Sequence, residues 1–173
     1  MQSIELLVDD ALAAEVRAEW DVLARAGLPS QARHTGATNA PHVTLGVSAD
    51  PLDDATEARL AGLDYGVGSP LTLGGLLVFP RRTAVLARLV VPTEHLLAVQ
   101  RSVHDALPAV PDRPAHTAPG TWTPHVTLAR RLDADQLAAA LHALAGRPRE
   151  LTGTVSSARR WDGDAKVTWD VGR

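Results

Sequence analysis

The sequence Pro41-His42-Val43-Thr44-Leu45 occurs a second time, unchanged, as Pro124-His125-Val126-Thr127-Leu128. Valine and threonine favour an extended chain, and alternate side chains of a strand point to opposite faces. Each copy therefore predicts a strand, at about residues 40–47 and 123–130, with its histidine and threonine on one face. The valine and leucine share the other face, which suits a core and leaves an imidazole and a hydroxyl exposed for chemistry.

The segments around the two motifs repeat in order. An apolar segment at 4–8 and a predicted helix over about 9–26 come before the first motif, and a predicted helix over about 93–107 comes before the second. Further helices are predicted from Asp50-Pro51 to about 62 and, from a capping-box sequence, over about 133–145. Hairpins at 70–91 and 151–171 follow, the second turning at Asp162-Gly163.

We interpret this order as an internal duplication within a single domain. Residues 1–173 are expected to form two pseudo-symmetric lobes that share a central cleft. The predicted fold class is α+β, bilobal and duplicated, with two antiparallel sheets flanking the cleft and helices outside. Because each lobe contributes one motif strand, two imidazoles and two hydroxyls are expected to face each other across the cleft.

Composition restricts the function classes. The chain has no cysteine, which excludes disulfides and thiolate chemistry. A net charge of −3 argues against an extended nucleic-acid surface, but it is compatible with a small arginine-lined site for one phosphate. No apolar stretch reaches the roughly 20 residues of a membrane span, and the first residues lack the features of a signal peptide. We expect a cytoplasmic monomer that does not interact with membranes.

Two histidines on opposite sides of one site form an acid–base pair. An unperturbed imidazole titrates near ~6.5, so one ring can accept a proton while the other donates one near neutral pH. Thr44 and Thr127 can donate hydrogen bonds to oxygens that carry charge in the transition state. Phosphodiester cleavage needs this set of groups and requires no metal or other cofactor, because the imidazoles transfer the protons. The motifs are symmetric, so the residues alone leave open which histidine is the acid.

Paired His-x-Thr motifs on a duplicated frame, from Ile4 to Val171, resemble the 2H phosphoesterase superfamily. The similarity is greatest to its 2′-5′ RNA ligase, or RNA 2′,3′-cyclic phosphodiesterase (LigT-like), branch, and residues 122–130 (Trp-Thr-Pro-His-Val-Thr-Leu-Ala-Arg) carry it most clearly. The resemblance implies hydrolysis of a 2′,3′-cyclic phosphate on a small nucleotide or RNA terminus, with reverse 2′-5′ ligation as a related activity. It also implies that His42 donates the proton and His125 accepts it.

Other residues near the motifs are candidates for binding substrate. Arg130 is a candidate phosphate ligand, although a regular strand would turn it to the face of Leu128. His34 and His116 precede the two motifs at similar spacing, and with Trp122 they are candidates for lining the substrate site. Together with His42 and His125 these make four histidines, which could in principle bind zinc. No carboxylate or cysteine accompanies them at ligand spacing, so we predict no metal site.

Two other functions are compatible with the same motifs. A non-catalytic module could hold a nucleotide or a phosphorylated metabolite in the same cleft without turnover. A zinc hydrolase would lose its activity in chelator, whereas the paired-histidine enzyme would not.

Overall fold

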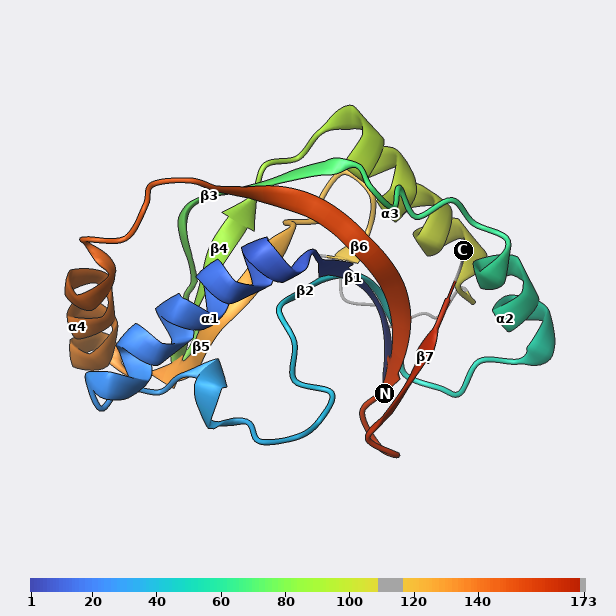
Figure 1. The fold of residues 1–173 in the computed structure, drawn as a ribbon. Helices are drawn as coiled ribbons and strands as arrows, with labels where there is room; N and C mark the ends of the chain where they lie inside the picture. Colours follow the sequence, from blue (N-terminus) through green and yellow to red (C-terminus); the bar gives the residue numbers. More distant parts are fainter. Residues whose placement is uncertain (109–116, 172–173) are drawn as a thin grey trace.

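A computed structural model gives the fold, and it describes residues 1–108 and 117–171. The elements, in chain order, are β1 (Gln2–Val8), α1 (Asp10–Arg25), a 3₁₀ turn at Gln31–Arg33, β2 (His42–Ser48), α2 (Asp54–Ala61), β3 (Pro70–Phe79), β4 (Ala84–Val90), α3 (Glu94–Ala106), β5 (His125–Leu132), α4 (Ala134–Leu144), β6 (Leu151–Asp162) and β7 (Val167–Asp170). The fold is α+β with four helices and an antiparallel sheet (Figure 1). The predicted fold class is therefore confirmed.

The strands form one seven-stranded sheet in the order β2-β1-β6-β3-β4-β5, with β7 paired to β6. The long strand β6 curves across the molecule and joins the two ends of the sheet (Figure 1). Its first residues pair with β3, and its later residues pair with β1. The two expected sheets are thus the two ends of a single sheet. Strands β2 and β5 lie at opposite ends of the hydrogen-bonded order yet contact each other, so the sheet bends back on itself.

The order strand-helix-strand-helix-strand occurs twice, from β1 to β3 and from β4 to β6. The pairing repeats as well, because β1 pairs with β2 and β6 as β4 pairs with β5 and β3. The last strand of each repeat therefore pairs with the first strand of the other: β3 pairs with β4, and β6 pairs with β1. The division into two lobes is our interpretation of this order.

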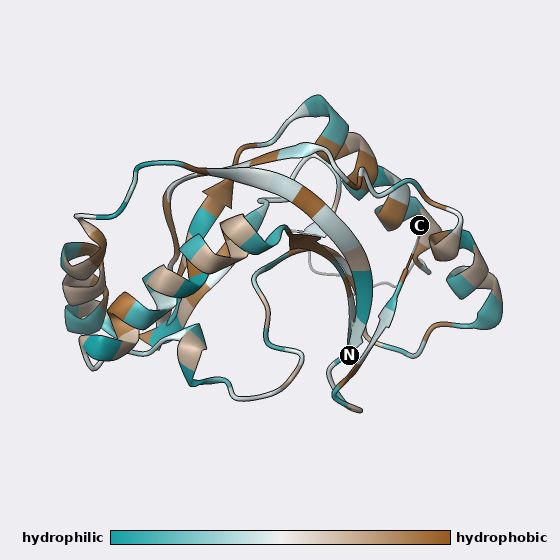
Figure 2. Ribbon diagram, in the orientation of Figure 1, coloured by the Kyte–Doolittle hydropathy of each residue, from teal (hydrophilic) through white to brown (hydrophobic). Residues whose placement is uncertain are grey.

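The helices begin where the sequence supplies a capping side chain. Asp9, Thr93 and Asp133 each accept a hydrogen bond from a backbone N–H of the first turn, and Asp133 forms the predicted capping box with Gln136. Helix α2 begins later than predicted, because the carboxylate of Asp53 caps it instead of Asp50. All four helices alternate hydrophobic and hydrophilic residues along their length (Figure 2).

The predicted apolar stripe of α1, formed by Leu12, Val16, Trp20 and Leu23, is buried in the core. The core is one continuous cluster of buried side chains from both repeats. Glycine allows a close approach at Gly46 in β2, where a Cβ atom would lie 2.7 Å from the Leu107 side chain that follows α3.

The last hairpin differs from the prediction. Residues 163–166 connect β6 to β7, so Asp162-Gly163 is not a two-residue turn. The carboxylate of Asp162 accepts hydrogen bonds from the backbone of Asp164 and Ala165, which lower its pKa. Lys166 takes the left-handed conformation, with φ of 60°. A side-chain hydrogen bond thus stabilises a longer loop than the Asp-Gly pair predicts.

Among the described residues, no helix combines the length and apolar character needed to cross a lipid bilayer.

Candidate active site

Both histidine motifs lie on strands, as predicted, and their side chains share one face of the sheet. His42 pairs with Leu7 in β1, and His125 pairs with Leu89 in β4. Following the paired residues across β1, β6, β3 and β4 puts the two histidines on the same face, which we call the motif face. The opposite face packs against α1 and α3. The sheet register therefore brings the predicted imidazoles and hydroxyls to one side.

The two imidazoles are held in the same way. Nδ1 of His42 lies 2.7 Å from the carbonyl oxygen of Ala40, and Nδ1 of His125 lies 2.8 Å from that of Thr123. A carbonyl can only accept, so each Nδ1 carries the proton and donates it. In the neutral ring this makes Nε2 the basic nitrogen, which is the position for acid–base chemistry. His42 is 27% exposed, so solvent and small molecules can reach it.

The two threonines follow the histidines on the motif face, and an indole fixes the backbone of each. Nε1 of Trp122 donates to the carbonyl of Thr44 at 3.0 Å, and Nε1 of Trp20 donates to the carbonyl of Thr127 at 3.1 Å. These carbonyls lie on the end strands β2 and β5, where the sheet supplies no further partner on the outer side. Trp122 is half-buried and packs against the core. The hydrogen bond from Trp122 to β2 positions the backbone of Thr44, and the amino-acid sequence did not predict it.

A buried ion pair lies beside His42. Glu5 is 3% exposed and Arg159 is 7% exposed, and their side chains are joined by contacts of 2.9 Å. The other carboxylate oxygen of Glu5 accepts from the Ser3 hydroxyl at 2.6 Å and lies 3.6 Å from Nε2 of His42. Glu5 was not predicted as a site residue. The alternation of Ser3 and Glu5 with the apolar Ile4 and Leu6 is the signal that could have found it.

Arg130 lies on the same face as the motif side chains. In a regular strand it would lie on the opposite face. Thr127 pairs with Ala87 and Ala129 pairs with the next residue, Leu86, so β5 has one extra residue at this point. This β-bulge shifts the alternation and returns Arg130 to the face of Thr127. Partial desolvation and the nearby charge of Arg81 lower the pKa of Arg130, while the charge of Glu5 acts in the opposite direction. Arg130 is therefore within electrostatic reach of the ion pair beside His42.

The remaining candidates contribute less to this face. His34 lies in an exposed loop between α1 and β2, and its carbonyl accepts from Asn39. His116 lies outside the described residues. Within residues 1–108 and 117–171, no cluster of three or more histidine or carboxylate side chains could hold a metal ion.

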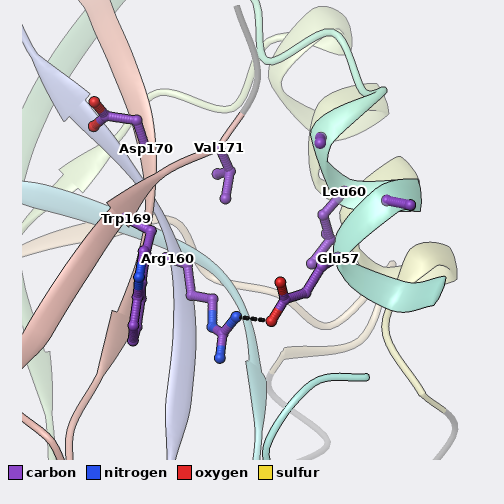
Figure 3. A pocket seen from close by; sticks show the side chains of 8 residues that line it. Glu57, Leu60, Arg160, Trp169, Asp170 and Val171 are labelled. Carbon is purple, nitrogen blue, oxygen red and sulfur yellow. Dashed lines mark hydrogen bonds and ion pairs between the residues drawn. The ribbon is translucent and has the colours of Figure 1, made fainter. Parts of the chain in front are cut away.

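A separate hollow of about 510 Å³ lies between α2, β6 and β7, where Glu57 forms an ion pair with Arg160 (Figure 3). Trp169 stacks on the guanidinium of Arg160 at 4.6 Å from its ring centroid. Arg160 follows Arg159 in β6 and so points to the face opposite the motif face. The hollow contains no motif residue and is not part of the candidate active site.

Comparison with known proteins identifies this fold. Three solved structures are similar to the chain over nearly its whole length. Usb1 from Kluyveromyces marxianus is 16% identical, with a TM-score of 0.56 over 98% of this chain and 97% of that one. Escherichia coli LigT, complexed with NADP+, is 20% identical, with a TM-score of 0.50 over 98% and 92%. A protein described as a phosphoesterase is 16% identical, with a TM-score of 0.51 over 99% and 98%. No curated protein matches the chain.

The arrangement is that of a 2H phosphoesterase. The chain belongs to the 2′-5′ RNA ligase superfamily, whose family model matches residues 9–166. The predicted resemblance is therefore confirmed. Membership supports a phosphodiesterase or ligase-like activity on an RNA or nucleotide substrate.

Proposed function

We propose that this protein is a metal-independent phosphodiesterase that hydrolyses a 2′,3′-cyclic phosphate, or a related cyclic or 2′-5′ phosphodiester, by paired-histidine catalysis. The observation that carries the proposal is the matched Nδ1 hydrogen bond of His42 and His125, which gives both rings the same tautomer on the same face of the sheet. Each ring can therefore present Nε2 as its basic nitrogen, as an acid–base pair needs.

His125 acts as the base in this mechanism and His42 acts as the acid. Nε2 of His125 takes a proton from the attacking water, and Nε2 of His42 gives a proton to the leaving 3′-oxygen as the P–O bond breaks. The product is a 2′-phosphate, and the same sequence with a 5′-hydroxyl in place of water would form a 2′-5′ linkage. The carboxylate of Glu5, 3.6 Å from Nε2 of His42, supports this assignment because it can interact with a protonated ring.

Thr44, Thr127 and Arg130 bind the reacting phosphate in this proposal. The two hydroxyls donate to its non-bridging oxygens, and the guanidinium of Arg130 neutralises charge that grows in the transition state. The indole hydrogen bonds of Trp20 and Trp122 hold the threonine backbones in place. We propose that the substrate lies between the motif strands of the two lobes, as a small nucleotide or an RNA terminus, and that the enzyme acts as a cytoplasmic monomer.

The test is turnover of 2′,3′-cyclic AMP in the presence of chelator, followed by ³¹P NMR of the product. We expect a 2′-phosphate product, undiminished activity in chelator and a bell-shaped dependence of kcat/KM on pH. Binding of the nucleotide without any product would favour a non-catalytic binding module. Loss of activity in chelator would favour a metal-dependent hydrolase.

A further inference from the structure

Phe79, Val85 and Arg130 form a row across three strands on the motif face. The ring of Phe79 lies 4.6 Å from that of His125, measured between ring centroids, and Phe79 pairs with Val85 in β4. Val85 lies between Leu86, which pairs with Ala129, and Ala84, which pairs with Leu132, so Arg130 and Arg131 lie opposite it in β5, and Arg130 shares its face. The end of β3 is thus next to the second motif. The exposed turn that follows it carries Arg81 and Arg82.

Arg81 and Arg130 come together from two different elements. Arg81 lies in the turn that joins β3 to β4, directly after the strand end at which Phe79 pairs with Val85. In agreement with this placement, desolvation and the positive charge of Arg81 lower the pKa of Arg130. In the described part of the chain, neither side chain forms an ion pair within 4 Å. Like charges held near each other with no carboxylate at ion-pair distance are stabilised when an anion binds beside them.

The position of Arg81 separates it from the reacting phosphate, which Arg130 can still reach. Arg130 lies two β4 positions beyond Thr127, because Val85 is two residues from Ala87. At ~3.3 Å per residue this is about 7 Å along the strand. Arg81 lies further out, in the turn beyond the strand end. A phosphate held by the histidines and Thr127 would therefore occupy the inner part of the face and leave Arg81 to another group.

We propose that Arg81, beside Arg130, forms a second anion subsite that binds a phosphate group on the 5′-oxygen of the nucleotide whose cyclic phosphate reacts. The proposal rests on the proposed function, since it names the substrate class of the same site. The second phosphate could come from a 5′-phosphorylated mononucleotide or from the internucleotide linkage of an oligonucleotide. Both present the same charged oxygens to the guanidinium.

A binding experiment tests the subsite without requiring turnover. Isothermal calorimetry would compare adenosine 2′-monophosphate with adenosine 2′,5′-bisphosphate on wild type, Arg81→Gln and Arg82→Gln. Arg82 is the matched control, because it is an exposed arginine in the same turn. We expect the wild type to bind the bisphosphate about tenfold more tightly, a modest gain because Arg81 is exposed. Arg81→Gln should lose most of this preference, and Arg82→Gln should keep it.

A kinetic experiment identifies the source of the second phosphate. It would compare kcat/KM for 2′,3′-cyclic AMP, its 5′-phosphorylated form and the dinucleotide ApA ending in a 2′,3′-cyclic phosphate. A gain for either longer substrate that Arg81→Gln abolishes supports the subsite, and the substrate that gains more identifies the source. Equal binding of the two ligands by wild type, or equal loss in both variants, overturns it. A binding preference without any turnover would refute the proposed function and leave the subsite standing.

Discussion

The two motif strands share the sequence His-Val-Thr-Leu, a β-bulge after the threonine and the same histidine hydrogen bonds, but the strands beside them differ. In the first repeat Thr44 pairs with Glu5, and Glu5 pairs with Arg159. In the second repeat Thr127 pairs with Ala87, and Ala87 pairs with Leu77. A buried ion pair thus occupies the positions that hold two apolar side chains in the other repeat.

This difference shows how a duplicated site can become asymmetric without changing its motif. The first histidine has a carboxylate neighbour, whereas the second has the ring of Phe79. Arg130 follows the β-bulge in β5, and the residue after the corresponding bulge in β2 is Val47. One side therefore has a buried ion pair beside its histidine and the other a guanidinium after its bulge, an asymmetry compatible with the separate acid and base roles that we propose.

The largest expected effect is loss of catalysis when either ring is removed. His42→Ala and His125→Ala should each lower kcat by about 10²–10⁴, the usual contribution of a positioned acid or base. Circular dichroism should show an unchanged fold. His142→Ala is the control, because His142 is exposed on α4. If His42→Ala retains full activity on 2′,3′-cyclic AMP, the paired mechanism is wrong.

The next effect comes from making the first repeat resemble the second. Glu5→Ala leaves the buried Arg159 without its carboxylate and should reduce the free energy of unfolding by about 3 kcal/mol or more. The double variant Glu5→Ala/Arg159→Leu copies the Ala87–Leu77 pair and should recover much of this loss. Urea unfolding measures both changes.

Activity separates the structural role of Glu5 from its role beside His42. If Glu5 supports the acid, the double variant should regain stability but keep a kcat about tenfold below wild type. Recovery of both stability and kcat would show that Glu5 only balances the charge of Arg159.

A smaller effect should follow from removing each indole N–H. Trp20→Phe and Trp122→Phe take the donor from the carbonyls of Thr127 and Thr44, at a cost of about 1–2 kcal/mol each in unfolding free energy. Trp20→Phe should cost more, because Trp20 is 4% exposed whereas Trp122 is only half-buried and water can replace its N–H. The opposite order would show that the Thr44 carbonyl depends on Trp122 more than its exposure suggests.

The smallest effect concerns the caps of α1 and α3, which are Asp9 and Thr93. Backbone hydrogen bonds from Leu12 and Thr154 lower the pKa of Asp9, so its carboxylate stabilises the fold above the ordinary pKa of aspartate and loses this effect as pH falls through the lowered value. Asp9→Thr should therefore reduce stability by about 1 kcal/mol at pH 7, and by less below pH ~4. A difference that stays constant from pH 7 to 3 would contradict the titration of Asp9.

The sequence predicted the features that depend on local patterns. Strand alternation predicted the shared face of His42 and Thr44, and capping residues predicted most helix starts. It did not predict the position of Arg130, because a β-bulge depends on the register with a neighbouring strand. It also missed Glu5 as a neighbour of His42, because that contact joins residues far apart in the chain. Nor did it predict that β6 pairs with both β1 and β3 and so makes one sheet of the two expected, because strand pairing also depends on residues far apart in the chain.

The position of a bound product tests the central proposal most directly. A crystal structure with adenosine 2′-monophosphate should place its phosphorus between Nε2 of His42 and Nε2 of His125, with the hydroxyls of Thr44 and Thr127 donating to its oxygens. A phosphate bound elsewhere, with the two rings too far apart to contact one phosphate, would contradict paired-histidine catalysis.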